Sequence, residues 1–415
     1  MTVPGPRGRR SVLVTDAGRP SALAVVRSLG RAGWRVVAAS SDRVSPALHS
    51  RYTAARARYP RPHHDPAGTV EAVLAAVRRH RVELVVPVTD DVIFPLAAAR
   101  TCFEGLTALA VADDDALATA SDKLATVRLA EAQGIAVPRT LAVEELGPEA
   151  ALAAASAGGL GWPVVLKPRR SYTYVAGAHP ERRWVGYAFD RGELRHRLAA
   201  AGDDVLLQEH HPGTGVAVGL LVHCGRPLAA FQHRRLREVP LTGGASSCRV
   251  SEPVDPTLLH AATALVGALG WTGLAMVEFR VAAGHAVLME INGRVWGALP
   301  LAVASGMDFP ARLAALHLDG SSSPPGPPDT GYRVGVCTRD LDGERAWLAA
   351  VLRGVPARPP FQVPPRREAL AVAVGLLRRG CQVDGFDRHD PVPGALEVVR
   401  VAAGVARRAV GHHRR

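Results

Sequence analysis

The sequence predicts a multidomain chain of mixed α/β and α+β class. Its 415 residues exceed what one ordinary hydrophobic core can hold. Residues 11–42 alternate strand, helix and strand, which is the unit of a parallel sheet. Residues 274–291 are two apolar runs around Ala-Ala-Gly-His, which is typical of an antiparallel hairpin. We therefore expect an N-terminal open parallel α/β domain followed by a part with antiparallel strands.

Composition excludes several functional classes. A hydrophobic share of 47% is typical of globular proteins, and no run approaches the roughly 18 apolar residues of a membrane span. The net charge of +12 is spread along the chain with few aromatics, unlike the clustered basic surface of nucleic-acid binders. The basic start precedes only a short apolar run, so it is no secretory signal. We predict a cytoplasmic protein without nucleic-acid or membrane partners.

The cysteines are scattered along the chain, with an odd total and no metal-ligand spacing. This pattern predicts a reducing compartment and no zinc site. The five positions are Cys102, Cys224, Cys248, Cys337 and Cys381.

Lysine is rare in this chain, and its positions are therefore informative. Of the 50 basic residues only Lys123 and Lys167 are lysine. Arginine supplies charge elsewhere, whereas a lysine ammonium acts as a compact point charge on a phosphate. These two lysines are candidate phosphate-binding residues.

The first 115 residues predict most of a parallel sheet. A turn with a single glycine, Gly18, follows the first strand, where a dinucleotide fingerprint has three. Polar residues Thr89, Asp90 and Asp91 end a later strand, where open sheets bind ligands, although Asp90 can equally cap a helix. The expected strands are 11–15, 35–40, 82–88 and 108–111, and the expected helices are 22–31 and 69–79.

The middle of the chain places both lysines at the ends of elements. Asp122 or Ser121 can cap a helix that runs to about residue 133, with Lys123 at its positive end, where a phosphate would balance the charges. Lys167 ends the strand 163–167. The irregular segment that follows it is typical of a mobile lid. Further expected elements are helices 148–157, 191–200 and 256–269 and strands 205–208, 216–223 and 228–234.

The hairpin carries one glutamate in each apolar strand. Glu278 and Glu290 fall nearly opposite each other, where like charges repel unless a cation lies between them. Asn292 adds an oxygen on the same face, and Arg294 continues that face toward an anion. Pairing of the glutamates with arginines is the structural alternative. The four residues together favour a magnesium site beside a phosphate.

Arg235 and Arg237 share one face of the strand before a glycine-bearing loop, 241–246. They can grip a substrate carboxylate with two hydrogen bonds each. Exposed arginines of an arginine-rich surface are the alternative interpretation. Beyond helix 310–318, the run Ser-Ser-Ser-Pro-Pro-Gly-Pro-Pro indicates a linker. After it we expect one amphipathic helix at 366–379 and no further chemistry.

Five motifs in order resemble those of the ATP-grasp ligases, a superfamily that includes biotin carboxylase, carbamoyl-phosphate synthetase and D-alanine ligase. They are SDK, VVLKP, LLQEHHPG, VEF and MEINGR, and the match covers about residues 11–318. The last motif, followed by Trp-Gly, is most similar to bacterial carboxylate-amine ligase-like members. The resemblance implies domains at 1–115 (pre-ATP-grasp), 116–208 (first ATP-grasp lobe with the lid) and 209–320 (second lobe with the metal site). A linker at 321–330 and an accessory segment at 331–415 follow.

The resemblance also implies roles for individual residues. Lys123 and Lys167 would hold the ATP phosphates, and the metal would be Mg²⁺, with Mn²⁺ as an alternative. Arg294 would steady the transferred phosphoryl group. The adenine edge would meet the backbone of Gln208, Glu209, His210 and His211, the metal would bind Glu278, Glu290 and Asn292, and a loop over the acyl phosphate would contain Thr242, Gly243 and Gly244.

Two departures from the superfamily pattern concern ribose binding and the lid. Gly215 stands where relatives often carry a ribose-binding acid. After Lys167, Arg-Arg-Ser-Tyr-Thr replaces the usual glycine-rich phosphate loop. These departures leave ribose contacts and lid closure open, while the metal and phosphate residues are intact.

The reaction expected from the resemblance is ATP-dependent ligation. ATP would phosphorylate a small carboxylate, and an amine would displace phosphate from the acyl phosphate. Two alternatives stay open, a bicarbonate-phosphorylating enzyme of the carboxylase or carbamoyl type and a non-catalytic ATP-binding module. A homodimer is also open, because dimers are common in the superfamily.

Overall fold

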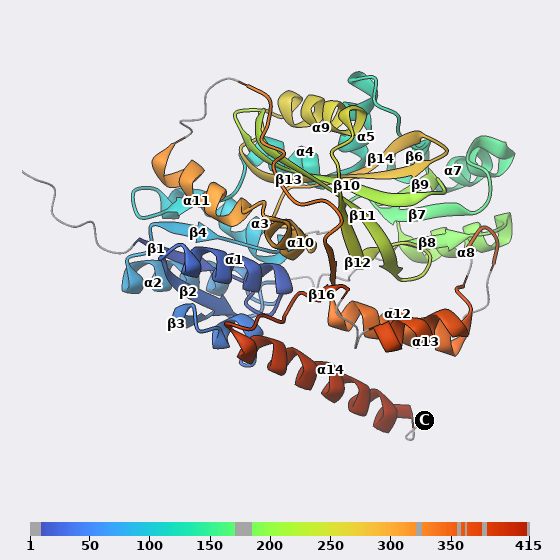
Figure 1. The fold of residues 1–415 in the computed structure, drawn as a ribbon. Coiled ribbons are helices and arrows are strands. Elements are labelled where there is room, and N and C mark those ends of the chain that lie inside the picture. Colours follow the sequence, from blue (N-terminus) through green and yellow to red (C-terminus); the bar gives the residue numbers. More distant parts are fainter. Residues whose placement is uncertain are drawn as a thin grey trace, which may run out of the picture. The chain divides into compact units, whose positions relative to one another are not determined.

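The chain divides into two compact units, which we describe separately. The computed structural model describes residues 10–170, 185–320, 326–354, 358–361, 363–375 and 380–412 (Figure 1). Unit 1 comprises residues 1–111, 233–253 and 294–415, and unit 2 comprises residues 112–232 and 254–293. No helix within the described ranges is long and apolar enough to cross a membrane.

Unit 1 begins with a five-stranded parallel sheet in the order β3-β2-β1-β4-β5. Its strands are β1 (Ser11–Val14), β2 (Arg35–Ser40), β3 (Thr53–Arg58), β4 (Leu84–Val86) and β5 (Ala108–Leu109). Leu13, Val37 and Val85 are fully buried in its core because parallel strands are covered on both faces. The helical elements are α1 (Pro20–Arg31), η1 (Pro46–His49), α2 (Pro66–His80), α3 (Asp90–Ala98) and η2 (Arg100–Phe103). The predicted open parallel α/β domain is confirmed.

Unit 2 contains a four-stranded antiparallel sheet in the order β6-β9-β7-β8. Its strands are β6 (Thr140–Ala142), β7 (Val164–Pro168), β8 (Gly186–Ala188) and β9 (Val205–Glu209). Its helical elements are α4 (Asp114–Ser121), α5 (Lys123–Ala132), α6 (Val143–Leu146), α7 (Pro148–Ala154), η3 (Ala155–Gly159) and α8 (Arg191–Ala201). The core of this sheet contains Leu166, Leu194 and Leu207. Lys167 follows Leu166 on β7, so its backbone is held by a packed strand.

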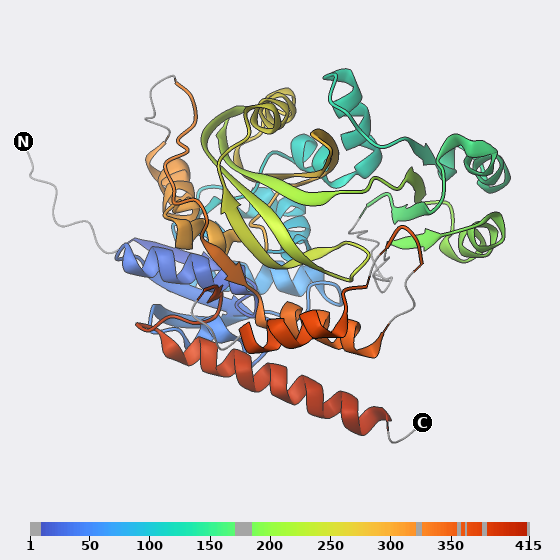
Figure 2. The same ribbon diagram turned by 45° about the vertical axis from the view of Figure 1, so that its right-hand side comes forward.

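A second group of strands in unit 2 contains the predicted hairpin. Strands β14, β13, β10 and the first part of β11 are neighbours in that order, and α9 packs on β10 (Figure 2). The bounds are β10 (Thr214–His223), β11 (Arg226–Val239), α9 (Pro256–Ala268), β13 (Gly273–Ala282) and β14 (His285–Asn292). Ala283 and Gly284 turn the hairpin, both with positive φ, as a two-residue turn between twisted strands requires.

The chain passes from unit 2 into unit 1 within β11. Strands β12, β15 and β16 belong to unit 1. There β12 (Ala245–Glu252) pairs with β15 (Cys337–Arg339), which pairs with β16 (Gln382–Val383). Helices α10 (Leu299–Ser305) and α11 (Phe309–Asp319) pack on α1.

The segment after the linker is more ordered than we expected. It contains α12 (Leu341–Arg353), α13 (Arg366–Gly375) and α14 (Pro391–His412), and α12 contacts both of the other two. The prediction of a single helix was therefore wrong. A buried ion pair at 2.9 Å between Arg27 on α1 and Asp390 before α14 ties this segment to the N-terminal sheet domain of unit 1. The pair joins residues 363 positions apart, which no local pattern could indicate.

The spacing of the cysteines did not indicate that three of them lie together. Cys337 and Cys381 form a disulfide in unit 1, and the buried thiol of Cys248 lies beside it. The sulfur of Cys248 is 3.7 Å from that of Cys337 and 3.8 Å from that of Cys381. The strand pairing of β12, β15 and β16 gathers three cysteines that lie far apart in the sequence.

Candidate active site

The two glutamates of the hairpin lie directly opposite each other, as predicted. Glu278 on β13 pairs in register with Glu290 on β14, and a bulge follows immediately, leaving Met289 without a strand partner. Nδ2 of Asn292 lies 3.1 Å from Oε1 of Glu278 and 3.2 Å from Oε1 of Glu290. All three polar side chains are half-buried, which makes the repulsion between the carboxylates costly.

This trio suits a hard divalent cation. Two carboxylates and one side-chain amide supply only oxygen ligands, as Mg²⁺ prefers. The amide nitrogen of Asn292 points at both carboxylates. Rotation of the amide by half a turn would present its oxygen instead, a choice that depends on what lies between the carboxylates. The donor set fits Mg²⁺, and a cation there would also screen the two facing negative charges.

Lys167 is held by a polar chain across the four-stranded sheet. Its Nζ donates to Oε1 of Gln208 at 2.7 Å, and Nε2 of Gln208 donates to Oγ1 of Thr140 at 2.9 Å. Gln208 is buried on the central strand β9, whereas Lys167 is half-buried. A buried amide with both ends bonded has a fixed orientation, so it positions the ammonium.

The electrostatic surroundings of Lys167 include the hairpin. Burial lowers the pKa of Lys167 to about 8, with further lowering by Lys123 and Arg280, while Glu290 and Glu278 oppose the shift. Two cations and two carboxylates of unit 2 thus act on one ammonium group. Perturbed pKa values of this kind are frequent at functional sites.

Asp122 organises the start of α5. Its Oδ1 accepts from the backbone N–H of Leu124 and Ala125, and its Oδ2 accepts from Arg169 at 2.8 Å and Arg170 at 2.9 Å. The predicted cap is confirmed, and Lys123 is the first residue of the helix. The backbone N–H of Lys123 donates to the carbonyl of Arg169 at 3.0 Å, so the two lysine-bearing segments are joined.

The predicted adenine-binding segment, residues 208–211, begins at Gln208, the hydrogen-bond partner of Lys167. The backbone N–H of Glu209 donates to the carbonyl of Arg139 at 2.9 Å. His210 and His211 come after the strand, and Nε2 of His211 is buried without a hydrogen-bond partner in the described part of the chain. Burial, together with Arg280, His211 and Lys167, lowers the pKa of His210. An orphaned buried nitrogen in this segment fits a site for a polar heterocycle.

The other predicted site residues belong to unit 1. Nε of Arg294 donates to Oδ2 of Asp90 at 2.9 Å. The N-cap position of α3 is Thr89, and Asp90 is the first residue of the helix. No side chain caps this helix, so the helix-cap alternative for Asp90 was wrong. Asp90 instead binds the arginine that the sequence analysis assigned to the phosphoryl group.

Arg235 and Arg237 both have acidic neighbours in unit 1. Nη1 of Arg235 lies 3.2 Å from Oε1 of Glu238 and 2.8 Å from the carbonyl of Gly244. Nε of Arg237 donates to the fully buried Glu344 at 2.9 Å, and its guanidinium lies 5.6 Å from the ring centroid of Trp347. A substrate carboxylate would compete with these contacts, most strongly at Arg237.

The predicted loop over the acyl phosphate is a tight turn between β11 and β12. Gly243 has a φ of +110°, and its N–H donates to the carbonyl of Pro240 at 3.0 Å. A Cβ atom on Gly244 would lie 2.4 Å from the carbonyl oxygen of Val239, so only glycine fits there. The predicted lid lies largely outside the described residues, which stop at Arg170 and resume at Val185.

Two contributors to the site were not identified from the sequence. Arg280 follows Glu278 by two residues on the same strand face and acts on both Lys167 and His210. Its Nη1 donates to the carbonyl of Gly213 at 2.9 Å. The second contributor is the side chain of Gln208, for which the sequence indicated a role of the backbone alone. The alternation Glu-Phe-Arg was a usable signal for Arg280, whereas the Lys167–Gln208 contact depends on strand pairing.

A known protein family and several solved structures resemble this chain. Residues 202–339 match a family model described as "ATP-grasp in the biosynthetic pathway with Ter operon". The predicted resemblance to the ATP-grasp superfamily is confirmed. The match spans the predicted adenine-binding segment, residues 208–211, and the hairpin with its carboxylates. None of the curated protein sequences compared with the chain matches it significantly.

Several solved structures share the ATP-grasp fold with this chain. A Campylobacter jejuni biotin carboxylase complex has a TM-score of 0.61 and 17% identity, covering 79% of this chain and 74% of its own. The biotin carboxylase domain dimer of Hydrogenobacter thermophilus 2-oxoglutarate carboxylase, with MgADP and bicarbonate, has a TM-score of 0.59 and 15% identity, covering 79% and 73%. Rhizobium etli pyruvate carboxylase, at 0.59 and 17% identity, covers 80% of this chain and 30% of its own. At such identities the likeness concerns the fold.

Proposed function

We propose that this chain is an ATP- and Mg²⁺-dependent ligase. It phosphorylates a small carboxylate to an acyl phosphate and couples the acyl group to an amine, with release of ADP and phosphate. The observation that carries the proposal is the pair Glu278–Glu290 with Asn292 between them, in the electrostatic field of Lys167. Binding of a nucleotide alone would not require three converging metal ligands.

Each residue of unit 2 has a defined role in the proposal. Lys123 and Lys167 neutralise the ATP phosphates, and the segment from Gln208 to His211 holds the adenine edge. Glu278, Glu290 and Asn292 hold Mg²⁺, which supplies positive charge to the phosphates when bound. Phosphoryl transfer depends mainly on positioning and charge neutralisation, so no side-chain nucleophile is needed.

The roles of the unit 1 residues rest on the resemblance. Arg294 steadies the transferred phosphoryl group, the Thr242–Gly243–Gly244 turn covers the acyl phosphate, and Arg235 binds the substrate carboxylate. For Arg237 the same role requires the substrate to displace Glu344. The acyl phosphate must be shielded from water, which is the task we assign to the segment after Arg170.

Bicarbonate phosphorylation is the second candidate. It is supported by the fold shared with biotin carboxylases, one of which was solved with MgADP and bicarbonate. A homodimer also stays a prediction, and the Hydrogenobacter relative is described as a domain dimer. Light scattering on the purified protein tests the dimer directly.

The decisive experiment measures ADP and phosphate release from MgATP against panels of carboxylates, amines and bicarbonate. Dependence on one carboxylate and one amine supports the ligase, and dependence on bicarbonate alone supports the second candidate. Glu290→Gln must abolish release, whereas Glu149→Gln, on the exposed first turn of α7, must preserve it. ATP binding without release on any pair would leave a non-catalytic ATP-binding module.

A further inference from the structure

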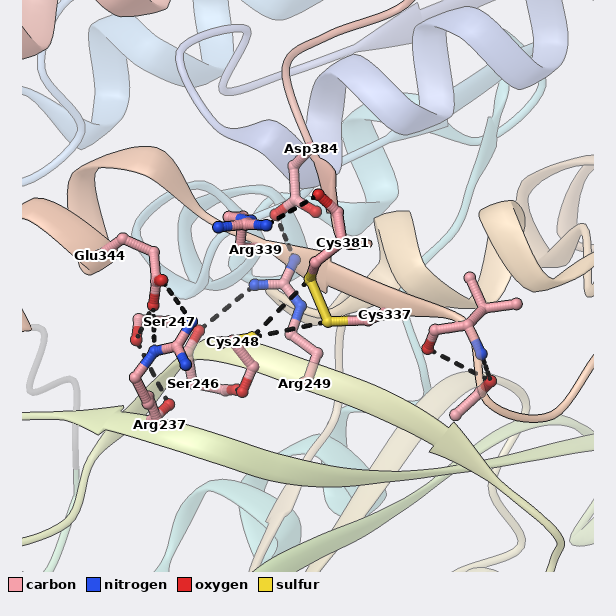
Figure 3. Close-up of a disulfide and its surroundings, with 12 residues drawn as sticks. Arg237, Ser246, Ser247, Cys248, Arg249, Cys337, Arg339, Glu344, Cys381 and Asp384 are labelled. Atoms are coloured by element: carbon pink, nitrogen blue, oxygen red, sulfur yellow. Dashed lines mark hydrogen bonds and ion pairs between the residues drawn. A yellow bond between two sulfur atoms is a disulfide. The ribbon is translucent and has the colours of Figure 1, made fainter. Parts of the chain in front are cut away.

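Three cysteines in unit 1 form a cluster outside the candidate active site. Cys248 on β12, Cys337 on β15 and Cys381 before β16 bring their sulfur atoms within 4.8 Å of one another (Figure 3). Two of the sulfurs form the disulfide, and the thiol of Cys248 is the third. Nothing in the proposed ligase reaction uses them.

The spacing around Cys248 fits a tetrahedral thiolate site. Zinc–sulfur bonds of about 2.3 Å place neighbouring ligand sulfurs about 3.8 Å apart. Cys248 is already 3.7 Å and 3.8 Å from the other two sulfurs. Only the Cys337–Cys381 pair must separate, and breaking their bond achieves this. Cys248 on β12, Cys337 on β15 and Cys381 just before β16 are held by neighbouring strands of one sheet, so separating the sulfurs of Cys337 and Cys381 needs little backbone movement.

The charges around the cluster favour an anionic metal–thiolate group. Arg237, Arg249 and Arg339 act on the Cys248 sulfur as cations. Glu344 pairs with Arg237, and the buried Asp384 pairs with Arg249, as Figure 3 shows. Three arginines near the sulfur of Cys248 favour the anionic, thiolate form of a ligand there.

We propose that the reduced cluster of Cys248, Cys337 and Cys381 binds one Zn²⁺ ion and that the disulfide is its metal-free, oxidised state. Thiolates are soft ligands that select zinc over Mg²⁺. Within the described residues no fourth side chain joins the group, so water completes the coordination. The half-buried Cys337 and Cys381 give the ion access, while Cys248 is buried.

The interconversion balances with a dithiol as reductant. The dithiol passes two electrons and two protons to the Cys337–Cys381 bond, giving two thiols, and itself becomes a disulfide. Binding of Zn²⁺ to the three thiols then releases three protons. The ion would clamp β12 to β15 and β16.

Cobalt(II) titration of the full chain, reduced with excess dithiol and then freed of it, tests the proposal. One equivalent of Co²⁺ should produce thiolate-to-cobalt absorption, which Zn²⁺ abolishes by displacement. Cys248→Ser and Cys381→Ser should lose the signal. Cys102→Ser and Cys224→Ser, which alter exposed free cysteines, should keep it. No thiolate band in the reduced wild type, or an unchanged band in Cys248→Ser, would overturn the proposal.

A second measurement needs no variant and therefore does not depend on variant folding. Zn²⁺ should protect Cys248, Cys337 and Cys381 from alkylation, read by peptide mass spectrometry, while Cys102 and Cys224 react at an unchanged rate. The oxidised protein should bind no Co²⁺ with thiolate character. Equal alkylation of all five cysteines with and without Zn²⁺ would refute the site.

Discussion

The ammonium nitrogen of Lys167 lies 2.7 Å from Oε1 of Gln208, a buried amide whose other end is bonded to Thr140. The lysine is therefore oriented by its neighbour on β9 and partly stripped of water. Burial brings its pKa to about 8. Phosphate binding needs the protonated form, and this form is depleted in the free protein as the pH rises through that value.

We therefore expect nucleotide affinity to fall above about pH 8, by up to about tenfold per pH unit. Gln208→Glu adds a negative charge beside the ammonium, which stabilises the cation and moves the decline to higher pH. Gln208→Leu removes the hydrogen-bond acceptor and moves it lower. Calorimetric titration of ATP from pH 7 to pH 10 measures this, and a flat profile in all three proteins would contradict it.

Removal of one hairpin carboxylate should stabilise the metal-free protein and abolish its stabilisation by Mg²⁺. Glu278 and Glu290 repel each other without a cation, so Glu290→Gln should stabilise the metal-free protein by roughly 0.5–1 kcal/mol. The same variant should lose the stabilisation that Mg²⁺ with a nucleotide gives the wild type. Thermal unfolding with and without these ligands measures both effects.

The control for this prediction is Glu149→Gln, which alters an exposed carboxylate of the same unit. It should change neither the melting temperature nor the response to Mg²⁺. A destabilised metal-free Glu290→Gln protein would mean that the carboxylate forms a necessary ion pair, which was the structural alternative to a metal site.

Local patterns were sufficient to predict this hairpin but not its surroundings. The apolar runs and the turn place Glu278 and Glu290 opposite each other because a strand has a period of two. Strand β3, by contrast, was not predicted, because it lies at a sheet edge and its apolar residues are all alanine. Helix α14 begins with Pro-Val-Pro-Gly, residue types that favour turns, and we predicted no helix there.

Long-range contacts account for the rest of what the sequence did not predict. The pairing of Arg237 with Glu344 joins positions 107 residues apart, and the Cys248 contacts join positions 89 and 133 apart. Neither separation has a local signature. The sequence therefore predicted the chemistry of residues on single strands, whereas the neighbours of those residues depend on strand order.

The ion pair between Arg237 and Glu344 should matter for stability. Glu344 is fully buried and also accepts from Ser247 at 2.8 Å. Glu344→Gln leaves the Arg237 guanidinium without its counter-charge, so we expect a loss of roughly 3 kcal/mol in unfolding free energy. The double variant Arg237→Met, Glu344→Met should recover part of it. Urea unfolding of the three proteins gives the values.

A role of Arg237 in binding the substrate would appear in the KM and not only in the stability of the protein. If its guanidinium binds the substrate carboxylate, Arg237→Met should raise the KM for that substrate beyond any effect of lowered stability. Arg235→Met is the matched comparison on the same strand face. An unchanged KM in Arg237→Met with a clear loss of stability would assign the residue to the fold alone.

Glu397 on α14 should make stability decrease as the pH rises. Burial raises its pKa from 4.5 to about 7, with Asp340 and Asp384 raising it further and Arg400 and Arg27 opposing. The folded state therefore keeps a proton between about pH 4.5 and pH 7 that the unfolded state has released. Because the folded state binds more protons there, stability falls across this window and stays lower above it.

Glu397→Gln should remove this contribution and stabilise the protein at pH 8 by up to roughly 3 kcal/mol, with little effect at pH 4. Asp384, whose pKa is raised to about 6, shifts stability in the same direction and leaves a residual slope. The exposed Glu368→Gln on α13 is the control and should keep the wild-type pH dependence. Urea unfolding from pH 4 to pH 8 tests this, and equal destabilisation of Glu397→Gln at both ends of that range would show that the carboxylate acts through a hydrogen bond, not its titration.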